Sequence, residues 1–147
     1  MNVYLEAAAL IKGSFRLNKG SMEWRSHEGG LCYCAMGAIL KADGKLAKYI
    51  TESDDYDGDP TEESWFAELM VPVARYINAG EHDFRVEYGY EPGVSAHRII
   101  YQWNDAEERT KSEVVEMLEA VGNLQERLIA GIEQAENGET KSLPEFE

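Results

Sequence analysis

The sequence predicts an α+β protein that is predominantly helical. Four or five helices are expected around a central helix that begins at Cys34 and a long C-terminal helix, with one or two short β-hairpins. Apolar residues recur every three or four positions in several stretches, and short alternating stretches lie beside glycine-containing turns. A chain of 147 residues can bury a sizeable core, and no linker divides it. We therefore expect one globular domain over residues 1–138 and a mobile tail over residues 139–147.

The first element is predicted to be a helix over residues 3–12, because apolar residues fall on one face and Gly13 follows as a C-terminal stop. A hairpin is expected next. Residues 15–17 and 22–24 alternate between apolar and polar on either side of the turn-forming residues 18–21.

A second, compact helix is predicted to begin with residues 34–40 and to end near residues 43–44. Its small residues Ala35, Gly37 and Ala38 allow another backbone to approach closely, which indicates a buried, central position. A further short helix is expected over residues 45–51.

Residues 52–63 contain seven acids and no base, which is typical of a solvated surface loop. Asp59 suits the N-cap of a following helix, with Pro60 in its first turn. That helix should extend to Asn78, with a kink or break at Pro72, where a backbone donor is missing.

The remaining elements are two alternating segments and a long helix. Residues 84–90 alternate as a half-buried strand does, and residues 97–103 fit either a strand or a helical turn, of which we favour the strand. Residues 110–113 form a capping box that opens the last helix, which should end near Gly138. Its apolar stripe consists of Val114, Met117, Leu118, Val121, Leu124, Leu128 and Ile132.

Charge is the least ordinary bulk property, with a formal net charge of −14. Residues 1–50 hold seven bases and four acids, whereas residues 51–147 hold seven bases and 24 acids. Such a field repels phosphate backbones and attracts basic protein surfaces, so direct nucleic-acid binding is not expected. With no apolar run of membrane-spanning length and no signal-like N-terminus, we expect a cytoplasmic protein without membrane contact.

A thiol-based active site is one candidate chemistry. Cys34 lies at a predicted helix N-terminus, where backbone donors stabilise a thiolate, and Cys34, His97 and Asn104 or Asp105 follow the chain order of papain-like hydrolases. The sequence around the cysteine lacks that family's signature. Cys34 and Cys32 are better explained as reduced thiols, at least one of them in the core.

Metal binding is a second candidate chemistry. With Gly58 at the sixth position of an EF-hand loop, three aspartates fall on ligand positions, but positions 53 and 64 are serines where the ends of the loop need acids. No histidine and carboxylate pair has helical ligand spacing, and no glycine-rich phosphate loop occurs. We therefore expect no metal site and no cofactor.

The most distinctive local pattern is Trp103-Asn104-Asp105 followed by Arg109. As a helix entry, it would bury the indole, bond the exposed turn amides through Asn104 and Asp105, and pair Arg109 with a neighbouring group. The alternative is a site for a small polar ligand, built from the amide, the carboxylate and the guanidinium.

Two segments resemble an uncharacterised family of small proteins from bacteria, especially actinobacteria, and their phages. Residues 34–39 are similar to its C-A-x-G-A segment, and residues 103–114 to its W-N-D-x3-R-T-x2-E-V segment. The resemblance covers roughly residues 5–130, and it implies no established activity.

The leading functional hypothesis is a non-enzymatic phage or bacterial protein that binds a basic surface of a host protein in the host cytoplasm, with DNA mimicry as one variant. Its acidic contact surface would comprise residues 52–63 and 105–119. The partner-binding residues predicted within the first of these ranges are Asp54, Asp55, Asp57, Asp59, Glu62 and Glu63. The alternatives are a cysteine hydrolase or transferase using Cys34, His97 and Asp105, and a scaffold protein that could form a homodimer through its long helix.

Overall fold

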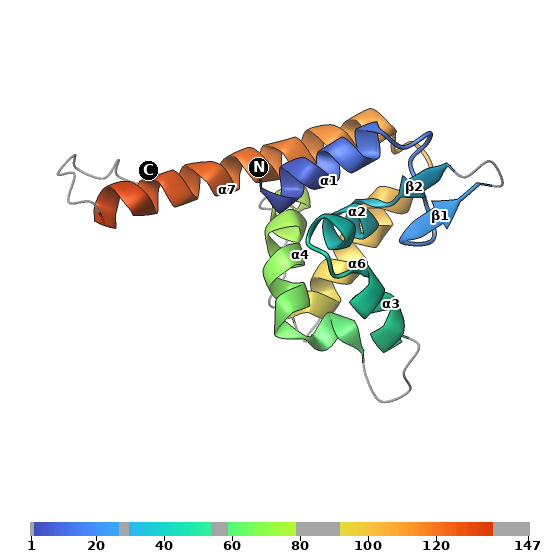
Figure 1. The fold of residues 1–147 in the computed structure, drawn as a ribbon, viewed down its shortest axis with the longest axis horizontal. Coiled ribbons are helices and arrows are strands. Elements are labelled where there is room, and N and C mark those ends of the chain that lie inside the picture. Colours follow the sequence, from blue (N-terminus) through green and yellow to red (C-terminus); the bar gives the residue numbers. More distant parts are fainter. Residues whose placement is uncertain (1, 27–29, 54–58, 79–91, 137–147) are drawn as a thin grey trace.

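The computed structural model describes residues 2–26, 30–53, 59–78 and 92–136, with side chains described up to residue 132. These residues form six α-helices, one 3-10 helix and one antiparallel hairpin (Figure 1). The predicted α+β, predominantly helical class is therefore confirmed. In chain order the elements are α1 Val3–Lys12, β1 Glu23–Arg25, β2 Leu31–Tyr33, α2 Ala35–Ala42, α3 Leu46–Ser53, η1 Pro60–Glu62, α4 Ser64–Ile77, α6 Pro92–Asp105 and α7 Lys111–Glu136.

The long helix α7 packs chiefly against α1, and the two lie side by side in Figure 1. Asn2 caps α1 by accepting hydrogen bonds from the amides of Tyr4 and Leu5, and its Nδ2 donates to the Gly122 carbonyl at 2.9 Å. A Cβ on Gly122 would lie 2.8 Å from the Leu5 side chain, so a larger residue there would force that side chain to shift. The main packing partner of the long C-terminal helix is therefore α1 and not the helix α2 that follows Cys34.

The C-terminal half of α7 extends beyond α1 in Figure 1. Its apolar stripe is exposed there: Leu124, Leu128 and Ile132 are 43%, 53% and 59% accessible. Among the described residues, the stripe is therefore buried only over its first half.

No helix in the described part of the chain is long and apolar enough to cross a membrane.

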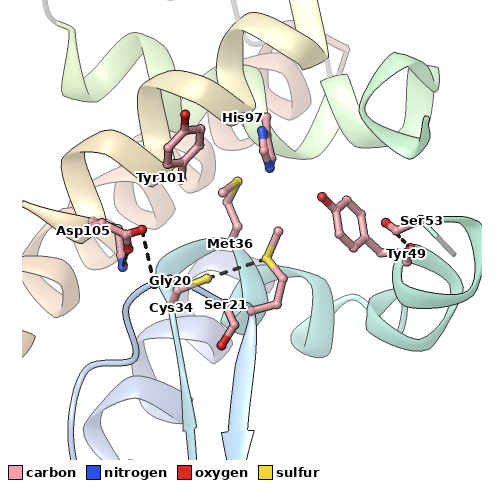
Figure 2. Close-up of a pocket in the computed structure, with 11 residues that line it drawn as sticks. Gly20, Ser21, Cys34, Met36, Tyr49, Ser53, His97, Tyr101 and Asp105 are labelled. Atoms are coloured by element: carbon pink, nitrogen blue, oxygen red, sulfur yellow. Dashed lines mark hydrogen bonds between the residues drawn. The ribbon is translucent and has the colours of Figure 1, made fainter.

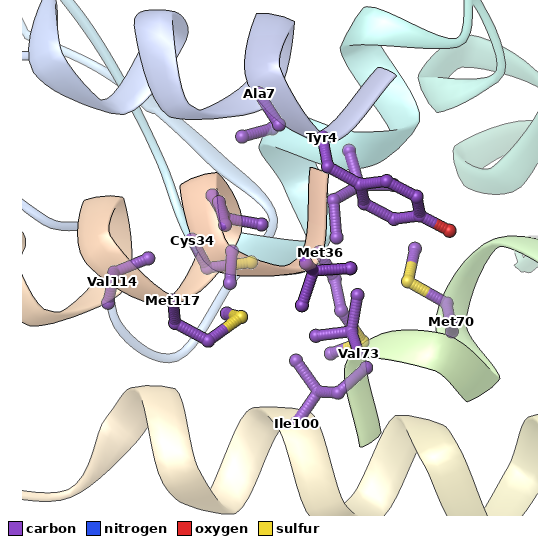
Figure 3. Packing of buried hydrophobic residues seen from close by; sticks show 14 of the residues in the cluster. Tyr4, Ala7, Cys34, Met36, Met70, Val73, Ile100, Val114 and Met117 are labelled. Atoms are coloured by element: carbon purple, nitrogen blue, oxygen red, sulfur yellow. The ribbon is translucent and has the colours of Figure 1, made fainter. Parts of the chain in front are cut away.

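The core lies where α1, α2, α4, α6 and α7 meet (Figure 3). Phe66, Ile100 and Leu118 are fully buried there, each from a different helix. Tyr4 points its hydroxyl toward α4 and donates to the Leu69 carbonyl at 2.8 Å, and burial raises the pKa of this phenol to about 12. One continuous apolar cluster thus holds five helices together.

The predicted helix at Cys34 is present as α2, with Cys34 as its N-cap, and all its residues from Ala35 to Leu40 are buried. Gly37 lies against the backbone just before β1, where a Cβ would be 1.9 Å from the Met22 carbonyl oxygen. The small residues of this helix predicted that another backbone lies close to it. That backbone is the edge of the hairpin, at Met22.

Two predicted strands are wrong. The segment 15–17 does not pair with residues 22–24; β1 pairs instead with β2, in the register Trp24 opposite Cys32. The segment 97–103 is part of the helix α6. Its buried residues Ala96, Ile99 and Ile100 follow helical spacing, and packing on α4 favours that period over the two-residue alternation.

Other boundaries differ in detail. The acidic stretch is not one loop, because Glu52 lies in α3 and Pro60–Glu62 form η1. Asp59 is an N-cap as predicted, accepting from the Thr61 amide at 3.0 Å. The single helix predicted from Pro60 is wrong, because Asp59 caps the short η1 and α4 begins separately at Ser64. The helix α4 runs through Pro72 without a break. The strand predicted over 84–90 and the tail 139–147 lie outside the described residues.

Candidate functional site

A cavity of about 590 Å³ lies between the loop at residues 20–22, the start of α2, and the helices α3 and α6 (Figure 2). Volumes of this size are typical of sites for small organic ligands. Its walls include Cys34, His97 and Asp105, which are the residues predicted from the sequence as an alternative catalytic set. They come from α2 and from two turns of α6, so the tertiary fold brings them to one place.

The thiol of Cys34 does not form a catalytic relay with the imidazole. Its Sγ accepts from the Gly37 amide at 3.2 Å and donates to Met22 Sδ at 3.6 Å. Among the described residues no hydrogen bond joins Cys34 to His97 or Asp105, and in Figure 2 the side chain of Met36 lies between the thiol and the imidazole. The three residues share a cavity without the contacts that general-base catalysis needs.

Burial keeps the thiol and the imidazole in their neutral forms. It raises the pKa of the Cys34 thiol to about 11, against a smaller lowering by the Gly37 amide. It also lowers the pKa of His97 below 6.5. A thiolate and imidazolium pair requires the opposite shifts, so the electrostatics of this site favour binding over nucleophilic attack.

Aromatic and thioether side chains form much of the cavity wall. Tyr49 stacks on the buried ring of Phe66 with centroids 5.7 Å apart, and His97 lies 5.3 Å from Tyr101 by the same measure. Burial also raises the pKa of Tyr49, so this phenol stays protonated. Met36 adds a polarisable sulfur to this wall.

The cavity has a carboxylate at one side, that of Asp105. Its Oδ2 accepts from the Gly20 amide at 3.2 Å, and its Oδ1 accepts from Asn104 Nδ2 at 3.0 Å.

Within the described part of the chain, no group of three or more His, Cys, Asp or Glu side chains could hold a metal ion.

Asn104 is the buried polar residue beside this carboxylate, with only 1% of its surface accessible. Its Oδ1 accepts from the Ala35 amide at 2.9 Å, and its Nδ2 donates to the Asn18 carbonyl at 3.0 Å. The prediction that Asn104 bonds the amides of its own turn is wrong. It instead satisfies a free donor at the start of α2 and so connects the two sequence segments that carry the family resemblance.

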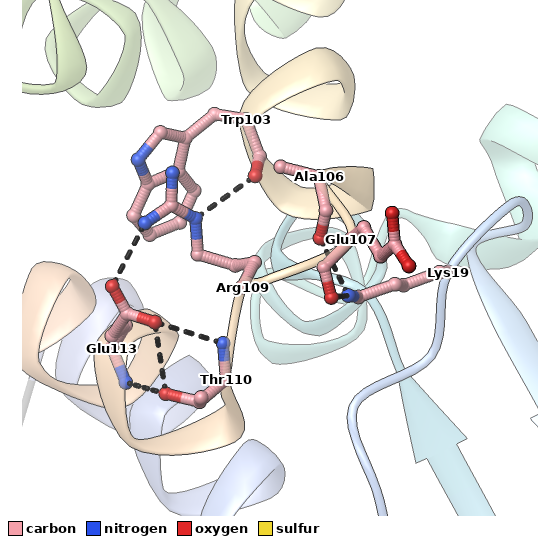
Figure 4. Close-up of polar contacts among 7 residues, drawn as sticks. All are labelled: Lys19, Trp103, Ala106, Glu107, Arg109, Thr110 and Glu113. Carbon is pink, nitrogen blue, oxygen red and sulfur yellow. Dashed lines mark hydrogen bonds and ion pairs between the residues drawn. The ribbon is translucent and has the colours of Figure 1, made fainter.

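Trp103 and Arg109 lie outside the cavity and form a turn between α6 and α7 (Figure 4). The Arg109 guanidinium stacks 4.0 Å from the Trp103 ring centroid, donates to the Trp103 carbonyl at 3.0 Å and pairs with Glu113 at 2.9 Å. Glu113 also completes the predicted capping box with Thr110, whose hydrogen bonds are the main cause of its lowered pKa. Arg109 is therefore occupied in the fold, as the helix-entry interpretation expected.

The predicted partner-binding acids are only partly described. Asp54, Asp55 and Asp57 lie outside the described residues. Asp59, Glu62 and Glu63 are exposed, with Asp59 also serving as the cap of η1.

Sequence reasoning missed the aromatic wall of the cavity, because it favoured a strand for residues 97–103. In a helix, His97, Tyr101 and Asp105 follow one another at intervals of four and share one face. This four-residue spacing in the sequence could have predicted that the three side chains form one wall of the site.

The fold and the cavity define a small, mostly helical α+β protein with a ligand-sized site. The chain belongs to the family of unknown function DUF6197, whose model matches residues 2–124. This confirms the predicted membership of an uncharacterised family, although the family's description names neither an activity nor an organism. Comparison with curated proteins and with solved structures finds no match.

Replacing Asn104 should test its role in joining α2, α6 and the loop at Asn18. Asn104→Ala leaves the buried Ala35 amide and the Asn18 carbonyl without this partner, and we expect the free energy of unfolding to fall by about 2 to 4 kcal/mol. The control is Gln102→Ala on the exposed side of the same helix, expected to change stability by less than about 0.5 kcal/mol. Urea unfolding followed by circular dichroism measures both; equal losses would contradict the assigned role.

Cysteine labelling tests the state of the thiol. Since a pKa of about 11 replaces the ordinary value of 9.0, the thiolate population of Cys34 near neutral pH should fall about a hundredfold. Iodoacetamide should therefore modify neither Cys34 nor the fully buried Cys32 in the native protein, and both after denaturation. Peptide mass spectrometry reads out each site. Rapid native labelling of Cys34 would show an activated nucleophile and favour the enzyme alternative.

Proposed function

We propose that this protein acts by binding, without catalysis, and that its ligand is a small molecule held in the cavity between α2, α3 and α6. The observation that carries the proposal is the cavity itself, of about 590 Å³, with apolar and aromatic walls and a few polar groups at its edge. Pockets of this composition recognise small ligands by shape and by a few directed contacts.

The state of the thiol supports binding over catalysis. A nucleophilic cysteine needs a base within hydrogen-bonding reach and a lowered pKa, whereas Cys34 bonds to Gly37 and Met22 and its pKa is raised. In this arrangement the sulfur is part of the wall that a ligand would contact.

A substitution that fills the cavity tests the proposal. Ser53 is the last residue of α3 and lines the cavity, so Ser53→Trp should occupy the space a ligand needs. Thr51→Trp adds the same indole at an exposed position of α3 that does not line the cavity, and it serves as the control. Ligand-detected NMR with a fragment library should find binders to the natural protein and to the control, with binding lost in Ser53→Trp.

Two outcomes would contradict this function. If no fragment binds the natural protein, the cavity is not a ligand site. If fragments bind Ser53→Trp and Thr51→Trp equally well, they bind elsewhere.

A second candidate is docking on a basic surface of a host protein, as the charge of the chain suggests. The net charge of −14 and the exposed carboxylates of Asp59, Glu62 and Glu63 support it, and Glu107, Glu108 and Glu116 add further exposed acids within residues 105–119. A phage origin and imitation of DNA are narrower forms of this candidate and stay predictions, as does a homodimer formed through α7.

Charge reversal tests the docking candidate. The double variant Glu62→Lys and Glu63→Lys should lose a partner captured from host lysate at low salt, and the natural protein should lose it at high salt. The control, Glu6→Lys with Glu68→Lys, carries the same net charge at exposed sites outside the acidic ranges and should keep the partner. A partner retained by both double variants would not be held by the proposed acidic surface.

A further inference from the structure

We infer that the cavity takes an organic cation, a small amine or quaternary ammonium group attached to an apolar body. This inference rests on the proposed function and names the ligand class of the same site. It follows from the charges, the aromatic faces and the sulfur atoms that line the cavity.

Among the residues that the structure describes, those lining the cavity carry acidic but no basic charge. The residues that line it include the carboxylate of Asp105, and none of them is lysine or arginine. His97, the remaining side chain that could carry positive charge, is disfavoured in its charged form by burial. An anionic ligand would therefore meet no counter-charge among the described lining residues, whereas a cation would meet that of Asp105.

The carboxylate of Asp105 retains capacity to accept further hydrogen bonds. Each of its oxygens accepts one hydrogen bond, from Gly20 at 3.2 Å or from Asn104 at 3.0 Å, and a carboxylate has about four acceptor positions. The two existing bonds hold the group in place at the wall. A ligand ammonium could bind the remaining positions without displacing either partner.

Aromatic and sulfur groups face the same space. The rings of Tyr49, Tyr101 and the neutral His97 line this space, and electron-rich aromatic rings attract a cation. The thioethers of Met22 and Met36 are polarisable and tolerate an apolar ligand body. These walls suit a cationic head attached to an aromatic or aliphatic group.

The electrostatic field inside the cavity has the same sign from two directions. Burial is the main cause of the raised pKa of Cys34 and of the lowered pKa of His97. Nearby carboxylates, Asp105 for the thiol and Asp59 for the imidazole, act to raise both pKa values, as negative charges near the cavity do. The net charge of −14 adds a long-range field that draws cations toward the protein.

Three probes of nearly equal size and different charge test the inference. Benzylamine is a cation near neutral pH, benzyl alcohol is neutral and benzoate is an anion. In NMR titrations of the labelled protein we expect benzylamine to shift the amides around Tyr101 and Asp105, with an affinity at least about tenfold above that of either other probe.

Variants assign the selectivity to the carboxylate. Asp105→Asn keeps an acceptor for the Gly20 amide and should weaken benzylamine about tenfold while leaving benzyl alcohol unchanged. Glu68→Gln removes the same charge at an exposed position of α4 and should leave both affinities unchanged. Urea unfolding of both variants checks that the fold is retained.

The outcomes separate the inference from the proposed function. Equal affinity for benzylamine and benzyl alcohol at the cavity would overturn the cation inference and leave small-molecule binding supported. A benzylamine affinity unaffected by Asp105→Asn would also overturn it. If none of the three probes shifts the cavity amides, the cation inference is wrong, and the fragment comparison with Ser53→Trp decides the proposed function by itself.

Discussion

The hydrogen bonds of one buried amide, that of Asn104, hold the parts of this structure in register. Through them the end of α6 is tied to the first free backbone donor of α2 and to the loop at Asn18, while the same side chain orients Asp105. A buried amide that satisfies groups on two other segments cannot move without leaving those groups unpaired. Because both α2 and α6 form walls of the cavity, this side chain helps to fix the relative position of those two walls.

Small residues complement that polar connection at the places where backbones approach closely. Gly37 lies against the strand edge at Met22, Gly93 against the Thr61 carbonyl, and Gly122 against α1. At Gly37 and Gly93 a methyl group would overlap a backbone oxygen, which cannot rotate away as a side chain can. The lack of a side chain at Gly93 therefore allows η1 to approach α6, and the lack of one at Gly37 allows the hairpin to approach α2.

Local signals predicted the parts of the fold that local chemistry determines. The capping residues of α7 and the stop after α1 each act within a few residues of chain, and the corresponding helices are predicted correctly from the sequence. The segment 97–103 satisfied two periods at once, and packing of Ile99 and Ile100 against other helices decided between them. The candidate site shows the same division. Cys34, His97 and Asp105 were named from residue type and order, but the burial that neutralises the first two is a property of the assembled core.

The family match ends at residue 124, close to where α7 leaves the support of α1. The turns before that point share the core with four other helices, whereas Leu124, Leu128 and Ile132 have little covering them among the described residues. A helical segment of about this length is marginal in water without tertiary packing. The last turns of α7 can therefore unwind and re-form without exposing the core, whereas unwinding of its first turns would expose Val114, Leu118 and Val121 to water.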